Sequence, residues 1–256
     1  MIKIFQVLII LSFATLSLSH NYSAFIDPQF VQKEILSYHY IESNNQQRTI
    51  RNLLISISST TTSYEIETKI DESTGSQWSD FLRMDRETIQ PLQNNFWYKE
   101  ASTHYNLHIE RRWDYAKNKI YRNYTQTDEN NHVYISTSDF NIFPYYMSDT
   151  MVFGVAPFID VSKPLDIQYK SPWIIVQLKS DKIESISIGE TKYECQKLIL
   201  TPKLDLFFFS IPIFYKTSYF WLSRSKKPRL VKAEINLSDD RITVMLKDIQ
   251  RKNDPI

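Results

Sequence analysis

The chain has 256 residues, of which 42% are hydrophobic, and its 30 basic and 29 acidic side chains give a formal net charge of +1. This apolar content excludes a disordered protein, and the balanced charge argues against a dedicated nucleic-acid binder. The single Cys and the 3 Gly exclude a disulfide framework, a multi-thiolate metal site and a glycine-rich phosphate loop.

Residues 1–19 have the pattern of a secretory signal peptide. Lys3 provides the positive start, residues 4–16 are mainly apolar, and Ser17 and Ser19 occupy the small-residue positions of a cleavage site. The sequence therefore predicts cleavage before His20 and export to the periplasm or the cell exterior, with a retained N-terminal anchor as the alternative. No later apolar stretch has the ~20 residues of a membrane-spanning helix, so no membrane span is expected after cleavage.

Most of the remaining chain has the composition and alternation of β-strands. The predicted strands of the N-terminal half are 35–41, 50–58, 64–70, 77–84 and 103–113. Those of the C-terminal half are 173–178, 184–188, 191–201, 215–222 and the two arms of a hairpin, 231–237 and 242–246.

The segment 143–172 differs from its surroundings because it holds four prolines: Pro144, Pro157, Pro164 and Pro172. Proline lacks the donor that a central strand needs, so this segment is either a connection between two β halves or a covering lid. Residues 146–152 have the pattern of a short helix stopped by Gly154. We therefore predict a mainly β protein with a large curved antiparallel sheet or half-open barrel and few short helices. Residues 20–256 form one β-rich domain in this interpretation.

No catalytic constellation, metal site or cofactor site emerges from the sequence. His104 and His108 have the spacing of a helical metal pair, but on a strand they lie about 13 Å apart, too far to share one metal. Cys195 is the only thiol, and a buried structural role is the commoner fate of such a residue. No nucleophile elbow or zinc-protease motif is present.

Two groups of residues are candidates for binding. The apolar group could line a ligand site or fill an ordinary β core, and its members are Phe207, Phe208, Phe209, Phe214 and Trp221. The basic group could contact anions or guard a hairpin loop against aggregation, and its members are Arg224, Lys226, Lys227 and Arg229.

The order of several short motifs resembles that of exported bacterial proteins grouped as "domain of unknown function 3108". The motifs are Lys33–Tyr40, Arg112–Tyr115, Tyr193–Leu198, Tyr219–Ser223 and Lys232–Ile235, and the resemblance extends over roughly residues 30–250. That family is similar to envelope proteins with curved antiparallel sheets, which include lipid and lipoprotein carriers.

Together these features favour an exported β-rich protein that binds an apolar ligand, such as a lipid or acyl chain, over an enzyme. One alternative is an interaction or structural module of the cell envelope, whose partner is an envelope protein. The other is a hydrolase with dispersed catalytic groups, because catalytic residues converge in space and not in sequence.

Overall fold

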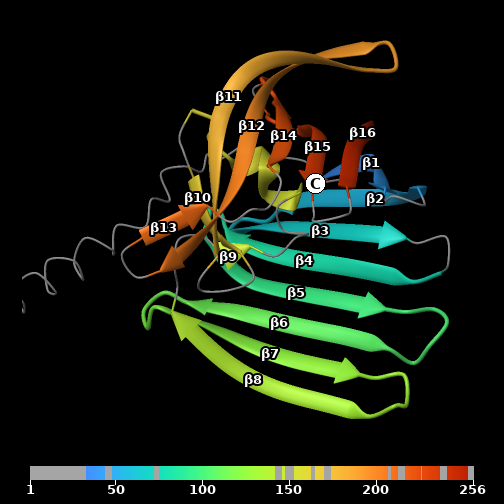
Figure 1. Ribbon diagram of the computed structural model, residues 1–256, viewed down its shortest axis with the longest axis vertical. Coiled ribbons are helices and arrows are strands. Elements are labelled where there is room, and N and C mark those ends of the chain that lie inside the picture. The colour runs from blue at the N-terminus through green and yellow to red at the C-terminus, as the bar shows by residue number, and fades with distance from the viewer. Residues whose placement is uncertain are drawn as a thin grey trace, which may run out of the picture.

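The computed structural model of the chain describes residues 33–43, 48–71, 75–141, 146–147, 153–162, 165–169, 174–206, 209–212, 217–225, 227–236 and 241–252. These residues form one 16-stranded sheet (Figure 1). The predicted fold class, a mainly β protein with a large curved antiparallel sheet, is confirmed. The predicted signal peptide lies outside the described residues.

The N-terminal half is an antiparallel meander in which each strand pairs with the next. Its strands are β1 (Lys33–Ser43), β2 (Arg48–Ser59), β3 (Ser63–Asp71), β4 (Gln77–Asp85), β5 (Pro91–Lys99), β6 (Asn106–Asp114), β7 (Lys119–Thr127) and β8 (Val133–Asn141). Buried residues alternate with partly exposed ones along β1 to β4, as in Glu34, Leu36, Tyr38 and Tyr40 of β1. Because side chains of a strand alternate between faces, the sheet has one inner face turned toward the core.

The C-terminal half continues the same sheet. Its strands are β9 (Tyr146–Met147), β10 (Leu165–Tyr169), β11 (Ile174–Ile188), β12 (Thr191–Leu206), β13 (Phe209–Pro212), β14 (Ser218–Ser223), β15 (Leu230–Asn236) and β16 (Arg241–Lys252). The last strand, β16, pairs with β1 along its length, so the two halves are hydrogen-bonded to each other as well as joined by the chain. Only the short β9–β10 pair is parallel among the described pairings.

The sheet is strongly curved. In Figure 1, β3 to β8 form a broad twisted wall, and the long β11–β12 hairpin arches away from it. Between the predicted strands 184–188 and 191–201, the dipeptide Gly189-Glu190 is typical of a tight turn, and this turn joins β11 and β12. Gly189 has the positive φ of 56° that glycine tolerates without strain.

The proline-rich segment covers the inner face as well as connecting the halves. Residues 153–155 form a helical turn that continues as the 3-10 helix η2 (Ala156–Phe158), and the side chains of residues 153–159 are buried. The ring of Phe158 meets Tyr64 of β3 edge to face at 5.1 Å between centroids, and the ring of Phe153 lies 6.4 Å from Phe220 of β14. Residues 153–159 therefore act as a plug between the two halves of the sheet.

The expected short helix over residues 146–152 is wrong at its first two residues, and residues 148–152 lie outside the described ones. Tyr146 and Met147 form β9, and Gly154 lies inside the helical stretch that it was expected to stop. Gly154 packs so closely on β3 that a Cβ atom would lie 2.6 Å from Cγ2 of Ile66. The close approach of the backbone to the sheet thus explains why position 154 is a glycine.

The main core lies under the plug. It joins residues of β1 to β4, the plug, β11, β12 and β14 to β16, together with Trp113 of β6 and Ile120 of β7. Its largest fully buried side chains are Tyr38, Tyr64, Phe158, Leu36, Leu53, Ile55, Ile57, Ile66, Ile70, Leu82 and Met84. Among the described residues, no helix is long and apolar enough to cross a membrane.

Candidate functional site

The predicted apolar group is only partly within the described residues. Phe207, Phe208 and Phe214 lie outside them, and Phe209 is the first residue of β13. Trp221 is described and lies on β14 between Phe220 and Leu222, which both belong to the main core. Alternation therefore places Trp221 on the outer face, away from the inner one.

Trp221 is packed into a small cluster on that outer face. It is 5% exposed and contacts Cys195 and Val231. Its indole Nε1 donates a 2.7 Å hydrogen bond to Glu184, and the ammonium groups of Lys197 and Lys232 lie 5.4 and 4.8 Å from its ring centroid. These contacts give Trp221 a role in holding β11, β12, β14 and β15 together.

Cys195 is a buried member of this cluster. Burial, with smaller contributions from the carboxylates of Glu184 and Glu194, raises the pKa of its thiol from the usual 9.0 to about 11. The thiol is therefore protonated at neutral pH, which fits the structural role expected of it.

The predicted basic group is divided between the surface and the interior. Arg224 pairs with Glu194 at 2.6 Å, and the two side chains are 47% and 63% exposed. Lys226 lies outside the described residues, and the carbonyl of Lys227 accepts hydrogen bonds from Arg229 and Ser225.

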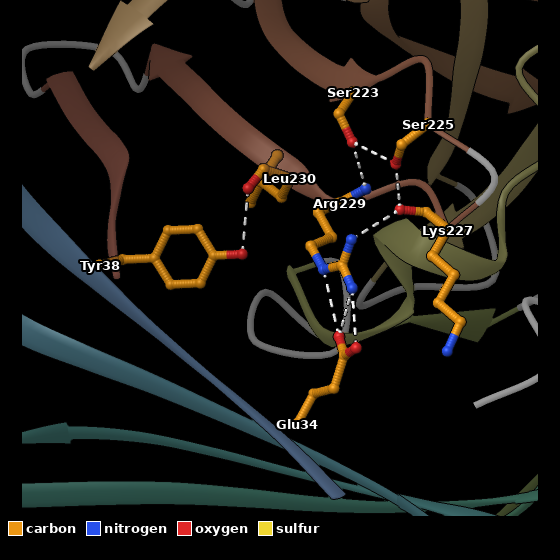
Figure 2. Close-up of polar contacts among 7 residues, drawn as sticks. All are labelled: Glu34, Tyr38, Ser223, Ser225, Lys227, Arg229 and Leu230. Carbon is orange, nitrogen blue, oxygen red and sulfur yellow. Dashed lines mark hydrogen bonds and ion pairs between the residues drawn. The ribbon is translucent and has the colours of Figure 1, made fainter. Parts of the chain in front are cut away.

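Arg229 faces inward and binds Glu34 of β1, as Figure 2 shows. Its Nη2 donates to both carboxylate oxygens at 2.7 Å, and its Nε donates at 3.1 Å. Both side chains are buried, at 9% and 3% exposure. Beside them the hydroxyl of Tyr38 donates to the carbonyl of Leu230 at 3.0 Å. The Arg229 guanidinium is thus bound within the fold and is not part of an exposed anion-contact surface.

Four of the five histidines are described, and only His104 and His108 are close to each other in the chain. His39 is on β1, His104 precedes β6, His108 is on β6 and His132 precedes β8. His108 stacks on Trp97 at 5.0 Å, and His132 contacts Asp128 at 3.0 Å. Among the described residues, no three His, Cys, Asp or Glu side chains gather as a metal site would require.

The candidate site is a part of the inner face that sequence reasoning missed. On β4 to β8, eight apolar side chains of the inner face remain partly or well exposed. One of them, Phe140, lies opposite the buried Ile120 and packs against the main core. We call the other seven the inner apolar surface, and they are Trp78, Phe96, Tyr98, Leu107, Ile109, Tyr124 and Tyr134.

Strand register makes this surface continuous. Trp78, Tyr98 and Leu107 form one row across β4 to β6. Phe96, Ile109 and Tyr124 form the next row across β5 to β7. Since directly opposite side chains in a sheet are about 5 Å apart, the two rows make one apolar surface on the sheet.

A polar row borders the inner apolar surface. Arg111 of β6 donates a 2.5 Å hydrogen bond to Oδ1 of Asn94, and the amide of Asn94 donates to Asp80 of β4. All three side chains are buried. Arg122 of β7 is the register partner of Arg111, and its Nε donates to the hydroxyl of Ser138 at 3.1 Å.

The sequence predicted only some of the strands that carry this site, because polar residues occur on both faces of the others. Only β4 and β6 correspond to predicted strands, 77–84 and 103–113. In β5, β7 and β8, Asn, Gln, Arg, Ser and Thr appear on both faces, so an apolar alternation is weak. The available signal was the recurrence of an aromatic residue on each of these strands.

Comparison with known proteins gives a likeness of fold. No model of a protein family matches the chain, and no curated protein matches it. Among solved structures, it is similar to a β-barrel-like protein of domain of unknown function DUF1849 from Brucella abortus. The TM-score is 0.51 and the identity 9%, covering 87% of this chain and 98% of the other.

Two further solved structures are more distant. The hypothetical lipoprotein YmcC from Escherichia coli K12 has a TM-score of 0.29 and 7% identity, covering 84% of this chain and 86% of that one. A putative outer membrane lipoprotein-sorting protein domain from Vibrio parahaemolyticus has a TM-score of 0.27 and 8% identity, covering 88% and 87%. The resemblance of the short motifs to the "domain of unknown function 3108" family stays a prediction.

Proposed function

We propose that the protein binds an apolar ligand, such as an acyl chain, on the inner apolar surface of β4 to β8. The observation that carries this proposal is the contrast along one sheet face. Under the plug, the inner-face side chains of β1 to β3 are almost fully buried, whereas those of the inner apolar surface stay partly exposed. Apolar ligand sites are lined mainly by hydrophobic and aromatic side chains, as this surface is.

Export to the cell envelope is part of the same proposal. It rests on the predicted signal peptide of residues 1–19 and on the family resemblance, both of which are sequence predictions.

Two tyrosines on β7 offer a matched test of the site. Tyr124 belongs to the inner apolar surface, and Tyr121, three residues earlier on the outer face, is 39% exposed. We expect Tyr124→Ser to weaken binding of a fluorescent apolar dye by about 5- to 20-fold, because it removes aromatic area from the site. Tyr121→Ser, the control, should leave binding unchanged.

Equilibrium fluorescence titration measures the affinity of each variant for the dye. Native mass spectrometry of the purified protein detects any apolar ligand that co-purifies. Absence of both dye binding and any co-purified apolar ligand would contradict the proposal, as would equal effects of the two substitutions.

A second candidate function is assembly with a second copy of this chain through β8, as an interaction module of the cell envelope. This strand is an edge of the described sheet, and Val133, Tyr134 and Ile135 on it are 60%, 54% and 74% exposed. An exposed apolar edge strand can pair with another chain by strand addition.

The test of this second function is the oligomeric state across a range of protein concentrations. If β8 pairs with a second copy, Ile135→Lys should shift the assembly toward monomer in analytical ultracentrifugation. The matched substitution Thr125→Lys, on the neighbouring strand β7, should not. An assembly that Ile135→Lys leaves intact would contradict this role.

A further inference from the structure

The inner face of β3 to β8 carries an uneven set of charges. By strand alternation its charged residues are Asp80 of β4, Arg111 of β6 and Arg122 of β7, one carboxylate against two guanidinium groups. An uncompensated charge on an otherwise apolar, partly buried face is costly unless it finds a counter-charge.

The two arginines differ in their surroundings. Arg111 is 6% exposed and is bonded to Asn94, which in turn is bonded to Asp80, so these three groups form a buried polar network. Arg122 is partly exposed, and its contact is with the neutral hydroxyl of Ser138. Within the described part of the chain, no carboxylate lies within ion-pair distance of Arg122.

Arg122 also lies directly at the edge of the inner apolar surface. On β7 it is two residues from Tyr124, on the same face and about 7 Å along the strand. Its partner across the ladder is Arg111, and the next inner-face residue of β6 is Ile109. A ligand lying over Ile109 and Tyr124 would therefore bring one of its ends to the Arg122 guanidinium.

We infer that the ligand is a long-chain carboxylic acid whose carboxylate pairs with Arg122 while its alkyl chain lies on the inner apolar surface. This inference rests on the proposed apolar site and adds the chemical class of the ligand. Arginine suits this role because its planar guanidinium binds a carboxylate with two parallel hydrogen bonds. Tyr124, Ile109 and Phe96 provide the adjoining contact for the chain.

Calorimetric titration of the full-length protein with dodecanoic acid, dodecanol and dodecylamine tests the inference. We expect the acid to bind about 10- to 100-fold more tightly than the alcohol, and the amine to bind more weakly than either. Arg122→Gln should lower the affinity for the acid to that for the alcohol and leave the alcohol unaffected. Arg122→Lys should retain part of the preference.

Arg112 provides the matched control. It is the neighbour of Arg111 on β6, but its side chain is 67% exposed and pairs with Glu110. Arg112→Gln should leave all three affinities unchanged, so a general loss of positive charge is separated from the loss of Arg122.

The outcomes distinguish the two proposals. If acid and alcohol bind equally to the unaltered protein, the carboxylate site is wrong and the apolar site stands. If no dodecyl compound binds, the apolar site itself is wrong. Circular dichroism of each variant checks folding, and the comparison of acid with alcohol on the unaltered protein decides the question even if Arg122→Gln fails to fold.

Discussion

Arg229 and Arg224 show how position decides what a basic residue does. Both belong to one dense basic stretch of the sequence, yet Arg224 forms an exposed pair with Glu194 and Arg229 forms a buried bidentate pair with Glu34. Exposed pairs contribute little because water screens them, whereas a buried charge depends on its partner. The partners Glu34 and Arg229 are 195 residues apart, so no local pattern connects them.

Substitution of the two arginines should therefore have different effects on stability. We expect Arg229→Met to lower the free energy of unfolding by about 3–5 kcal/mol, because it leaves the Glu34 carboxylate buried without its counter-charge. Arg224→Met should cost less than about 1 kcal/mol. Urea unfolding followed by tryptophan fluorescence measures both.

A double variant separates the pair from the general cost of substitution. Glu34→Leu with Arg229→Met should be more stable than Arg229→Met alone, because it removes the unpaired charge. A double variant that is the less stable of the two would contradict this interpretation.

Among the elements, the plug of residues 153–159 decides which part of the sheet is core and which part is open. It packs Phe158 on Tyr64 and Phe153 near Phe220, so it ties β3 to β14. Beyond it, the inner faces of β5 to β8 keep partly exposed apolar side chains. The inner apolar surface stays partly exposed because residues 153–159 do not cover it.

Gly154 tests the packing of this plug. We expect Gly154→Ala to destabilise the protein by about 1–3 kcal/mol, because the added methyl would lie 2.6 Å from Cγ2 of buried Ile66. The direction of this change in stability is informative, because Ala is otherwise preferred to Gly in a helical stretch by about 1 kcal/mol.

Thermal unfolding of a mutant cycle provides the control. In an Ile66→Ala background the obstructing methyl is absent, so Gly154→Ala should cost less there or become stabilising. The same cost in both backgrounds would show that contact with Ile66 is not the cause.

For the whole molecule, the pairing of β1 with β16 makes the two halves one sheet. Tyr38 of β1 also donates to the Leu230 carbonyl of β15, and Glu34 binds Arg229 just before that strand, so three contacts fasten the beginning of the described chain to its end. Most of the strands could be predicted from alternation. The pairing of β1 with β16 could not be predicted, because periodicity within a short window of sequence carries no information about a partner strand that is distant in the chain.

The sequence by itself determined the β class, the hairpin of β15 and β16, the turn at Gly189 and the lack of a local catalytic motif. Alternation, turn residues and proline positions act over a few residues, so they can be read without a fold. Only the tertiary structure decided that the proline-rich segment is a plug, that Arg229 is buried, that Trp221 faces outward, and that β4 to β8 present an apolar surface beside Arg122. These features depend on which distant segments cover which face, and burial is a property of the folded chain.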